Sequence, residues 1–96
     1  MMVLVSYDVS TKTDTGVRRL RHISEICLDF GFRVQNSVFE CNVDPEHWEI
    51  LKDKLLAKYK KDEDSLRFYF LGSNWKRRVE HYGNKKSQDI EDILII

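Results

Sequence analysis

The sequence predicts one small α+β domain in which two helices cover one face of an antiparallel sheet. Three observations support this fold class. Apolar residues recur at helical spacing in two segments, they form strand-like runs in the segments between, and 96 residues leave room for a single domain over 1–96. With 42% hydrophobic and 33% charged residues, the chain has the composition of a folded protein rather than a disordered one.

The first strand and the first helix are predicted before Gly31. Val3 begins a short β-branched run to Asp8 that is typical of a central strand. The segment 10–16 is a polar loop in which Asp14 or Thr15 is expected to cap the helix. Apolar residues then recur at helical spacing until Gly31. These residues are Val17, Leu20, Ile23, Cys27 and Phe30.

The segment from Phe32 to Val43 is strand-like, but the phase of its alternation changes. Its apolar residues occupy even positions up to Val34 and odd positions from Phe39 onward. A period of two cannot change phase without a turn or a bulge, and the change falls at residues 35–37. The pattern therefore predicts two short strands or one long strand with a bulge.

A second helix is predicted from Asp44-Pro45, with Asp44 as its cap and Pro45 in its first turn. Its buried stripe is expected at Trp48, Leu51, Leu55 and Tyr59, with Leu56 beside them. A charged loop over 60–64 follows, and the alternation of Leu66, Phe68 and Phe70 then predicts a strand that ends at Gly72.

The predicted order is β-α-β-β-α-β with an additional C-terminal strand near 92–96, which is the ferredoxin-like arrangement. An apolar strand at a free end is a pairing hazard, because its backbone groups are unpaired. We therefore expect this strand to pack against a second copy, so that the protein is a homodimer; the alternative is a tail folded back on its own sheet. A short chain also gains most from such a partner, since it buries a modest share of its own surface.

Basic residues gather in two stretches, although the net charge is zero. The first stretch contains Lys12, Arg18, Arg19, Arg21, His22 and Arg33, and the second contains Arg67, Lys76, Arg77, Arg78, Lys85 and Lys86. The acids lie mainly in 44–64 and near the C-terminus. Because the local field attracts a polyanion more than the total charge does, the distribution favours a nucleic-acid backbone as partner.

The arginines of the first helix and the residues around Trp75 are the candidates for that contact. Arg18, Arg19 and Arg21 leave the helix near its N-terminus, where the dipole favours anions, and a guanidinium suits phosphate. The alternative is a solvated helix face that pairs with acids further along the helix. Lys76, Arg77 and Arg78 follow a tryptophan, which suits backbone contact with stacking; the alternative is a bland basic surface.

Asp8 is the candidate metal ligand. It closes the first strand immediately before a loop, where a carboxylate can reach both solvent and an ion. Mg²⁺ takes oxygen ligands and keeps several waters, so one or two carboxylates can hold it. A strand-end aspartate also commonly caps a loop or a helix, and spacing alone leaves both interpretations open.

Other chemistries find little support in the sequence. His22, His47 and His81 lack metal-like spacing, no phosphate-binding glycine loop or CxxC pair is present, and Ser37 falls in a turn. Cys27 and Cys41 are expected to be buried free thiols, the alternative being a redox or metal role. The N-terminal residues lack a basic region and reach Asp8 early, so we expect no signal peptide, no membrane span and a cytoplasmic protein.

Together these segments resemble the CRISPR-associated protein 2 family, the small subunit of the spacer-acquisition machinery. The resemblance rests on VLVSYDV (3–9), RRLRHI (18–23), RVQNSVFEC (33–41), SLRFYFLG (65–72) and NWKRRVEHYG (74–83). It covers nearly the whole chain in order, and the combination is most similar to the type I-C branch.

The resemblance implies a homodimer with C-terminal strands packed across the interface, in CRISPR antiviral defence. It implies that Asp8 is the metal-binding and catalytic residue of an endonuclease that uses Mg²⁺, or another divalent ion such as Mn²⁺, to hydrolyse RNA or DNA. The implied partners are nucleic acid, above all double-stranded DNA, and the integrase, CRISPR-associated protein 1. The alternative within the family is a non-catalytic scaffold that joins the integrase to spacer DNA. The predicted nucleic-acid contacts are Arg18, Arg19, Arg21, Arg33, Lys76, Arg77 and Arg78.

Two further classes share the strand order. An RNA-recognition motif would carry stacking aromatics and a basic-glycine-aromatic signature on its central strands, which this sequence lacks. A regulatory ligand-binding domain of ferredoxin-like fold would leave the basic stretch at 76–78 unexplained.

Overall fold

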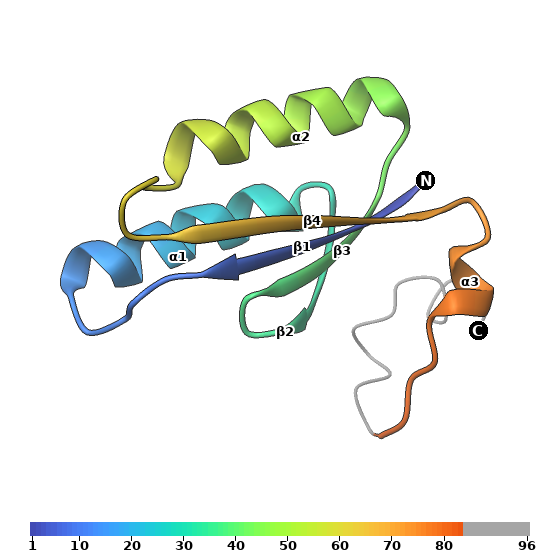
Figure 1. Cartoon of the computed structure of the whole chain (residues 1–96), viewed down its shortest axis with the longest axis horizontal. Helices are drawn as coiled ribbons and strands as arrows, with labels where there is room; N and C mark the ends of the chain where they lie inside the picture. The colour runs from blue at the N-terminus through green and yellow to red at the C-terminus, as the bar shows by residue number, and fades with distance from the viewer. Residues whose placement is uncertain (84–96) are drawn as a thin grey trace.

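The computed structural model describes residues 1–83, and its strands form one antiparallel sheet beneath two helices (Figure 1). The strand order is β2-β3-β1-β4. The elements are β1 (Met2–Asp8), α1 (Asp14–Leu28), β2 (Gly31–Gln35), β3 (Val38–Asn42), α2 (Pro45–Lys58), β4 (Ser65–Gly72) and the single turn α3 (Trp75–Arg78). The predicted α+β ferredoxin-like arrangement is confirmed, and the strand predicted near 92–96 lies outside the described residues.

The starts of α1 and α2 show how nearby side chains determine the residue at which a helix begins. At α2 the prediction is confirmed, because the Asp44 carboxylate accepts a hydrogen bond from the His47 amide at 2.7 Å and Pro45 opens the helix. At α1 the predicted caps, Asp14 and Thr15, are wrong. Thr13 has extended backbone angles, and its hydroxyl accepts from the Gly16 amide at 3.1 Å. Asp14 is instead the first helical residue, where its charge faces the positive end of the helix dipole.

Helix α1 also ends earlier than its apolar spacing predicts. It stops at Leu28, and Gly31 begins β2 rather than closing the helix. A side chain at Gly31 would meet the Glu40 carbonyl oxygen of β3 at 2.0 Å. The glycine is therefore needed for the close approach of the two strands and not for helix termination.

The phase change between β2 and β3 comes from a turn at residues 36–37, and β2 also contains a register shift between Arg33 and Gln35. Both of the predicted features, a turn and a bulge, are therefore present. Their consequence is that Phe32 and Val34 of β2 lie on the face opposite to Phe39 and Cys41 of β3. Phe39 and Cys41 are buried beneath the helices, whereas Phe32 pairs with Glu40 on the other face.

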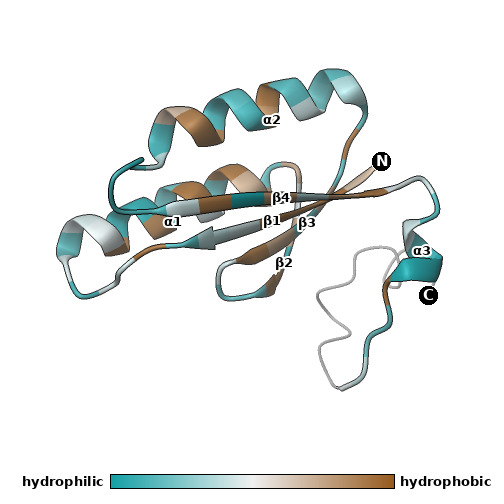
Figure 2. Cartoon of the chain, viewed as in Figure 1, coloured by the Kyte–Doolittle hydropathy of each residue, from teal (hydrophilic) through white to brown (hydrophobic). Residues whose placement is uncertain are grey.

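The core lies between the sheet and the helices (Figure 2). The strand residues that face it include Val3, Val5 and Tyr7, and α2 contributes Trp48, whose ring meets Phe68 edge-on at 4.8 Å between centroids. The predicted stripe of α2 is confirmed at Trp48, Leu51 and Leu55. Leu56, which is expected beside this stripe, and Val17 of α1 are about half exposed.

The opposite face of the sheet is not covered by α1 or α2. Because side chains alternate along a strand, Leu4, Ser6 and Asp8 of β1 point to this open face. Leu4 and Ser6 line a cavity of about 730 Å³ on it, together with Phe32, Val34, Val38 and Tyr69. The chain segment 79–83 forms another wall of this cavity. The open face therefore carries both apolar side chains and polar ones, among them Ser6, Gln35 and Glu40, and it ends at Asp8.

Adjacent leucines on α2 test the core assignment. Leu55 is 0% exposed and Leu56 is 45% exposed. We expect Leu55→Ala to lower the free energy of unfolding by about 2–5 kcal/mol, because it leaves a cavity in the core. The matched variant Leu56→Ala should change it by less than about 0.5 kcal/mol. Urea denaturation of both variants measures this, and equal losses would contradict the packing described.

Candidate functional site

Asp8 is exposed at the end of β1, as its position in the sequence predicts. It forms the last pair of the β1–β4 ladder, opposite Ser65. Its carboxylate makes no hydrogen bond or ion pair with any other residue in 1–83. The side chain therefore has both oxygens available at the margin of the open face.

The donor set around Asp8 suits a hard cation only in part. Within residues 1–83 there is no group of three or more histidine, cysteine, aspartate or glutamate side chains that could hold a metal ion. Mg²⁺ is commonly bound through one or two carboxylates, with waters and substrate phosphates as its remaining ligands. A single Asp8 fits one of those carboxylate positions.

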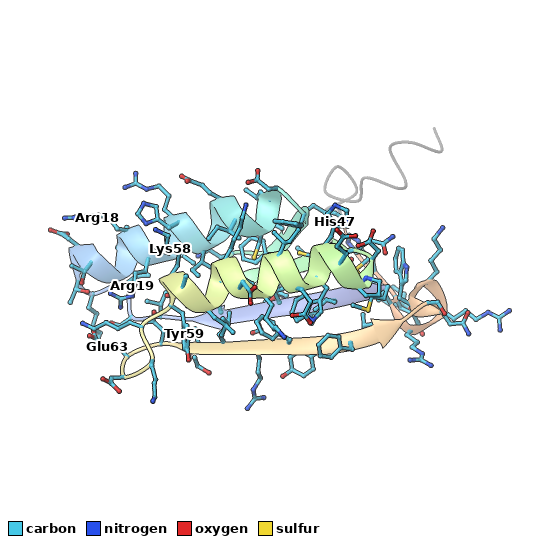
Figure 3. All side chains as sticks on the ribbon, turned by 90° about the horizontal axis from the view of Figure 1, so that it is seen from above. Arg18, Arg19, His47, Lys58, Tyr59 and Glu63 are labelled. Carbon is cyan, nitrogen blue, oxygen red and sulfur yellow. The ribbon has the colours of Figure 1, made fainter. Side chains whose placement is uncertain are left out.

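A buried carboxylate lies directly behind this site. The Asp64 side chain is 0% exposed and accepts hydrogen bonds from Arg19 Nε at 2.8 Å and from Arg19 Nη2 at 3.0 Å. It also accepts from the Tyr7 hydroxyl and from the Lys60 amide at 2.9 Å. Figure 3 shows Arg19 between α1 and the loop that carries Glu63, which lies 3.8 Å from the guanidinium.

These contacts fix the protonation of the three side chains. Burial raises the pKa of Asp64, but the hydrogen bonds from Arg19, Tyr7 and the Lys60 amide outweigh it and hold that pKa below its usual value. Burial and the hydrogen bond to Asp64 raise the pKa of the Tyr7 hydroxyl. The bond to Asp64 likewise raises the pKa of Arg19. At neutral pH the ionised Asp64 carboxylate therefore accepts hydrogen bonds from the charged Arg19 guanidinium and from the neutral Tyr7 phenol.

The predicted phosphate contacts divide into two groups in the structure. Arg18 and Arg21 are exposed on α1, whereas the Arg19 side chain is only 15% exposed and turns to Asp64. Residues 76–78 are exposed on α3, at the far end of the molecule from Arg18 (Figures 1 and 3). Among residues 1–83, Arg18 and Arg21 are therefore separated from Lys76, Arg77 and Arg78 in a molecule whose longest dimension is 40 Å.

Arg33 belongs to neither group. It pairs with Phe39 on the side of β2 that faces the helices, and its guanidinium carbon lies 5.2 Å from the centre of the Phe39 ring. Its Nε atom is buried and has no hydrogen-bond partner among the described residues. The side chain borders a small groove against α1 that Arg21 also lines, so Arg33 lies beside the exposed basic residues of α1 rather than among them.

The structure also places the two cysteines and His47, which the sequence offers as other candidate groups. Cys27 and Cys41 are buried free thiols, as predicted, and the Cys41 thiol lies 3.8 Å from the Cys27 carbonyl oxygen. His47 is exposed, and its Nδ1 atom lies 2.8 Å from the Asp44 carboxylate. No helix within residues 1–83 is long and apolar enough to cross a membrane.

The Asp64 network is the part of the site that the sequence does not predict. Asp64 ends a charged loop, and its partners Arg19 and Tyr7 lie 45 and 57 residues away. No spacing rule connects residues so far apart. The one local signal is the position of Asp64 directly before the strand whose first residue pairs with Asp8.

Comparisons with known proteins agree with the motifs. A family model described as "CRISPR associated protein Cas2" matches residues 1–79. The chain is 58% identical over 96 residues to "CRISPR-associated endoribonuclease Cas2" of Chlorobaculum tepidum, covering 100% of both chains. It is 50% identical over 95 residues to "CRISPR-associated endonuclease Cas2" of Halalkalibacterium halodurans, covering 99% of both. A crystal structure of Streptococcus pyogenes Cas2 matches with 54% identity and a TM-score of 0.79, over 86% of this chain and 100% of that one.

The depressed pKa of Asp64 predicts a specific dependence of stability on pH. Because the folded pKa lies below the unfolded value of about 3.9, the carboxylate stabilises the fold above that pH, and this contribution is lost as pH falls through the folded pKa. Asp64→Asn should therefore be less stable than the wild type at pH 7, and the difference should shrink below about pH 4.

Urea denaturation between pH 7 and pH 2.5 measures that difference. Glu63→Gln is the matched control, since the neighbouring carboxylate is 48% exposed and should contribute little. If the free energies of unfolding of Asp64→Asn and the wild type differ by the same amount over the whole pH range, the result contradicts an ionised, hydrogen-bonded Asp64.

Proposed function

The chain belongs to the CRISPR-associated Cas2 family, and we propose that it is a Mg²⁺-dependent endonuclease of CRISPR adaptation in which Asp8 residues from two copies hold the metal. The observation that carries this proposal is the Asp8 carboxylate. It is exposed, has no partner within residues 1–83, and stands at the margin of a sheet face that neither α1 nor α2 covers.

The open face supports pairing with a second copy. Leu4, Phe32, Val38 and Tyr69 leave apolar surface on it, and a chain of this size gains stability when such surface is removed from water. In a two-fold interface the same patch meets itself, so residues near the axis meet their own copies. Two Asp8 side chains near that axis would supply the two carboxylates that the metal needs.

The residues of the chain then have distinct tasks in phosphodiester hydrolysis. A bound Mg²⁺ would lower the pKa of a coordinated water and offset charge on the reacting phosphate. Asp8 would hold the ion, and the exposed Arg18 and Arg21 would hold flanking phosphates through their guanidinium groups. Arg19 contributes no such contact in this arrangement, because its Nε and Nη2 atoms already donate to Asp64.

The spacing of the basic residues favours an extended substrate. Arg18 and the α3 residues Lys76, Arg77 and Arg78 lie toward opposite ends of a 40 Å molecule, which corresponds to about 12 base pairs of duplex. The named relatives include an endoribonuclease and an endonuclease. We propose double-stranded DNA as the principal partner and RNA as a further substrate, in the cytoplasm of a cell with a type I-C system.

A scaffold function is the second candidate, and a specific observation favours it. One chain offers one carboxylate at the end of β1, with no metal-binding cluster among residues 1–83, whereas the exposed basic residues are numerous. These residues would hold spacer DNA against the integrase, CRISPR-associated protein 1, without any cleavage. We propose this bridging as the cellular task and nuclease activity as a property of the isolated dimer.

Cleavage assays separate the two candidates. We expect purified wild type to cut labelled double-stranded DNA or single-stranded RNA with Mg²⁺ and not with chelator, and Asp8→Ala to lose at least about a hundredfold in rate while still binding. Cutting that persists in Asp8→Ala would overturn the proposed site. Binding without any cutting by the wild type would leave the scaffold as the function.

The dependence of binding on salt tests the basic residues. Each phosphate contact contributes about 0.9 to the slope of log K against log salt, so Arg18→Ala and Arg77→Ala should each flatten it by about one. Lys58→Ala is the control, because Lys58 is exposed on α2 outside both basic stretches. Equal slopes for all four proteins would contradict the proposed contact surface.

A further inference from the structure

We propose that Asp64 is a positioning residue for Asp8, holding the end of β1 against the start of β4 through Tyr7 and Arg19. The inference concerns the orientation of the candidate metal ligand and rests on the function proposed above. Asp64 touches neither metal nor substrate in this arrangement. It acts through Tyr7, the residue next to Asp8 in the chain.

The register of the sheet places this contact beside Asp8. Asp8 and Ser65 form the last pair of the β1–β4 ladder. The residue before Asp8 is Tyr7, the residue before Ser65 is Asp64, and the Tyr7 hydroxyl donates to the Asp64 carboxylate. Ends of ladders fray, because their last pair has no neighbour on one side. A side-chain hydrogen bond that joins the two strands at this end opposes that fraying.

Helix α1 holds both sides of Asp8. On the N-terminal side, Arg19 donates two hydrogen bonds to Asp64, which in turn holds Tyr7. On the C-terminal side, α1 packs against the loop so closely that a Cβ on Gly16 would lie 1.9 Å from the Ser10 carbonyl oxygen. Asp8 lies between these two fixed points, so its backbone is restrained from both directions.

The chemistry of the contact favours a fixed geometry over simple stabilisation. One Asp64 oxygen accepts from Arg19, Tyr7 and the Lys60 amide, and the other accepts from Arg19. A buried ion pair is weak evidence for stability, since desolvation offsets its attraction, but directional hydrogen bonds restrict the positions of its partners. Displacing a catalytic group by about 1 Å can cost a hundredfold in rate, so such a restraint has functional value at Asp8.

Tyr7→Phe is the sharpest test, because it removes the hydroxyl and leaves the buried ring in place. With Asp64→Asn as the second variant, we expect kcat for Mg²⁺-dependent cleavage to fall about tenfold or more and KM for nucleic acid to stay constant. Direct Mn²⁺ binding, followed by electron paramagnetic resonance, should weaken by a similar factor. Backbone amides of residues 7–10 should exchange hydrogen faster than in the wild type.

Ile23→Val is the control, since it removes one methylene from the buried face of α1 and leaves the hydrogen bonds of Asp64 in place. It should lower Tm without changing kcat, Mn²⁺ affinity or exchange at residues 7–10. The inference is overturned if Tyr7→Phe and Asp64→Asn leave exchange at 7–10 unchanged, or if their kcat equals that of Ile23→Val. If the wild type neither cuts nor binds Mn²⁺ through Asp8, the proposed nuclease fails instead, and the exchange measurement still decides whether Asp64 holds Asp8.

Discussion

The buried ion pair between Arg19 and Asp64 is the constraint on which the geometry of this end of the molecule depends. A carboxylate without access to water is costly unless donors replace its hydration, and here two guanidinium bonds, a phenol and a backbone amide do so. These donors come from α1, from β1 and from the loop before β4. Satisfying a single charge therefore fixes the relative positions of three segments that are far apart in sequence, and Asp8 is adjacent to one of them.

The two faces of the sheet differ in what covers them. The face beneath α1 and α2 is filled by residues such as Val3, Val5 and Phe39, which make a closed core. The open face is also rich in apolar side chains, because the phase change between β2 and β3 sends Phe32 and Val34 there. A chain of 96 residues has little surplus stability with which to expose them. The same surface thus favours association and carries Asp8 at its margin, so that stability and metal binding would both depend on one interface.

The features that the sequence predicts well are those set by neighbouring residues. The Asp44-Pro45 helix start, the phase change at residues 35–37 and the strand end at Asp8 each depend on a few adjacent side chains. The sequence places the cap of α1 one or two residues too late, since Thr13, Asp14 and Thr15 are all suitable caps and only the backbone angles select among them. The contact of Arg19 with Asp64 cannot be predicted from the sequence for another reason. Arg18 and Arg19 are equivalent in composition, but they lie about 100° apart around the helix, and one of them turns inward to a carboxylate 45 residues away.

A metal site divided between two copies has a consequence for how the two proposed functions relate. In the proposed arrangement, the exposed arginines that would hold a nucleic-acid backbone belong to each chain alone, whereas the ligand set for Mg²⁺ would be complete only when two chains meet. Binding therefore tolerates small changes in the geometry of the pair, because phosphate contacts through long side chains are adaptable. Cleavage does not, because two carboxylates must approach one ion at about 2.1 Å. Rotation of one copy against the other by a few degrees would then stop cleavage and leave DNA capture intact. In this respect the proposed restraint of Asp64 on Asp8 would matter for the nuclease and would be dispensable for the scaffold.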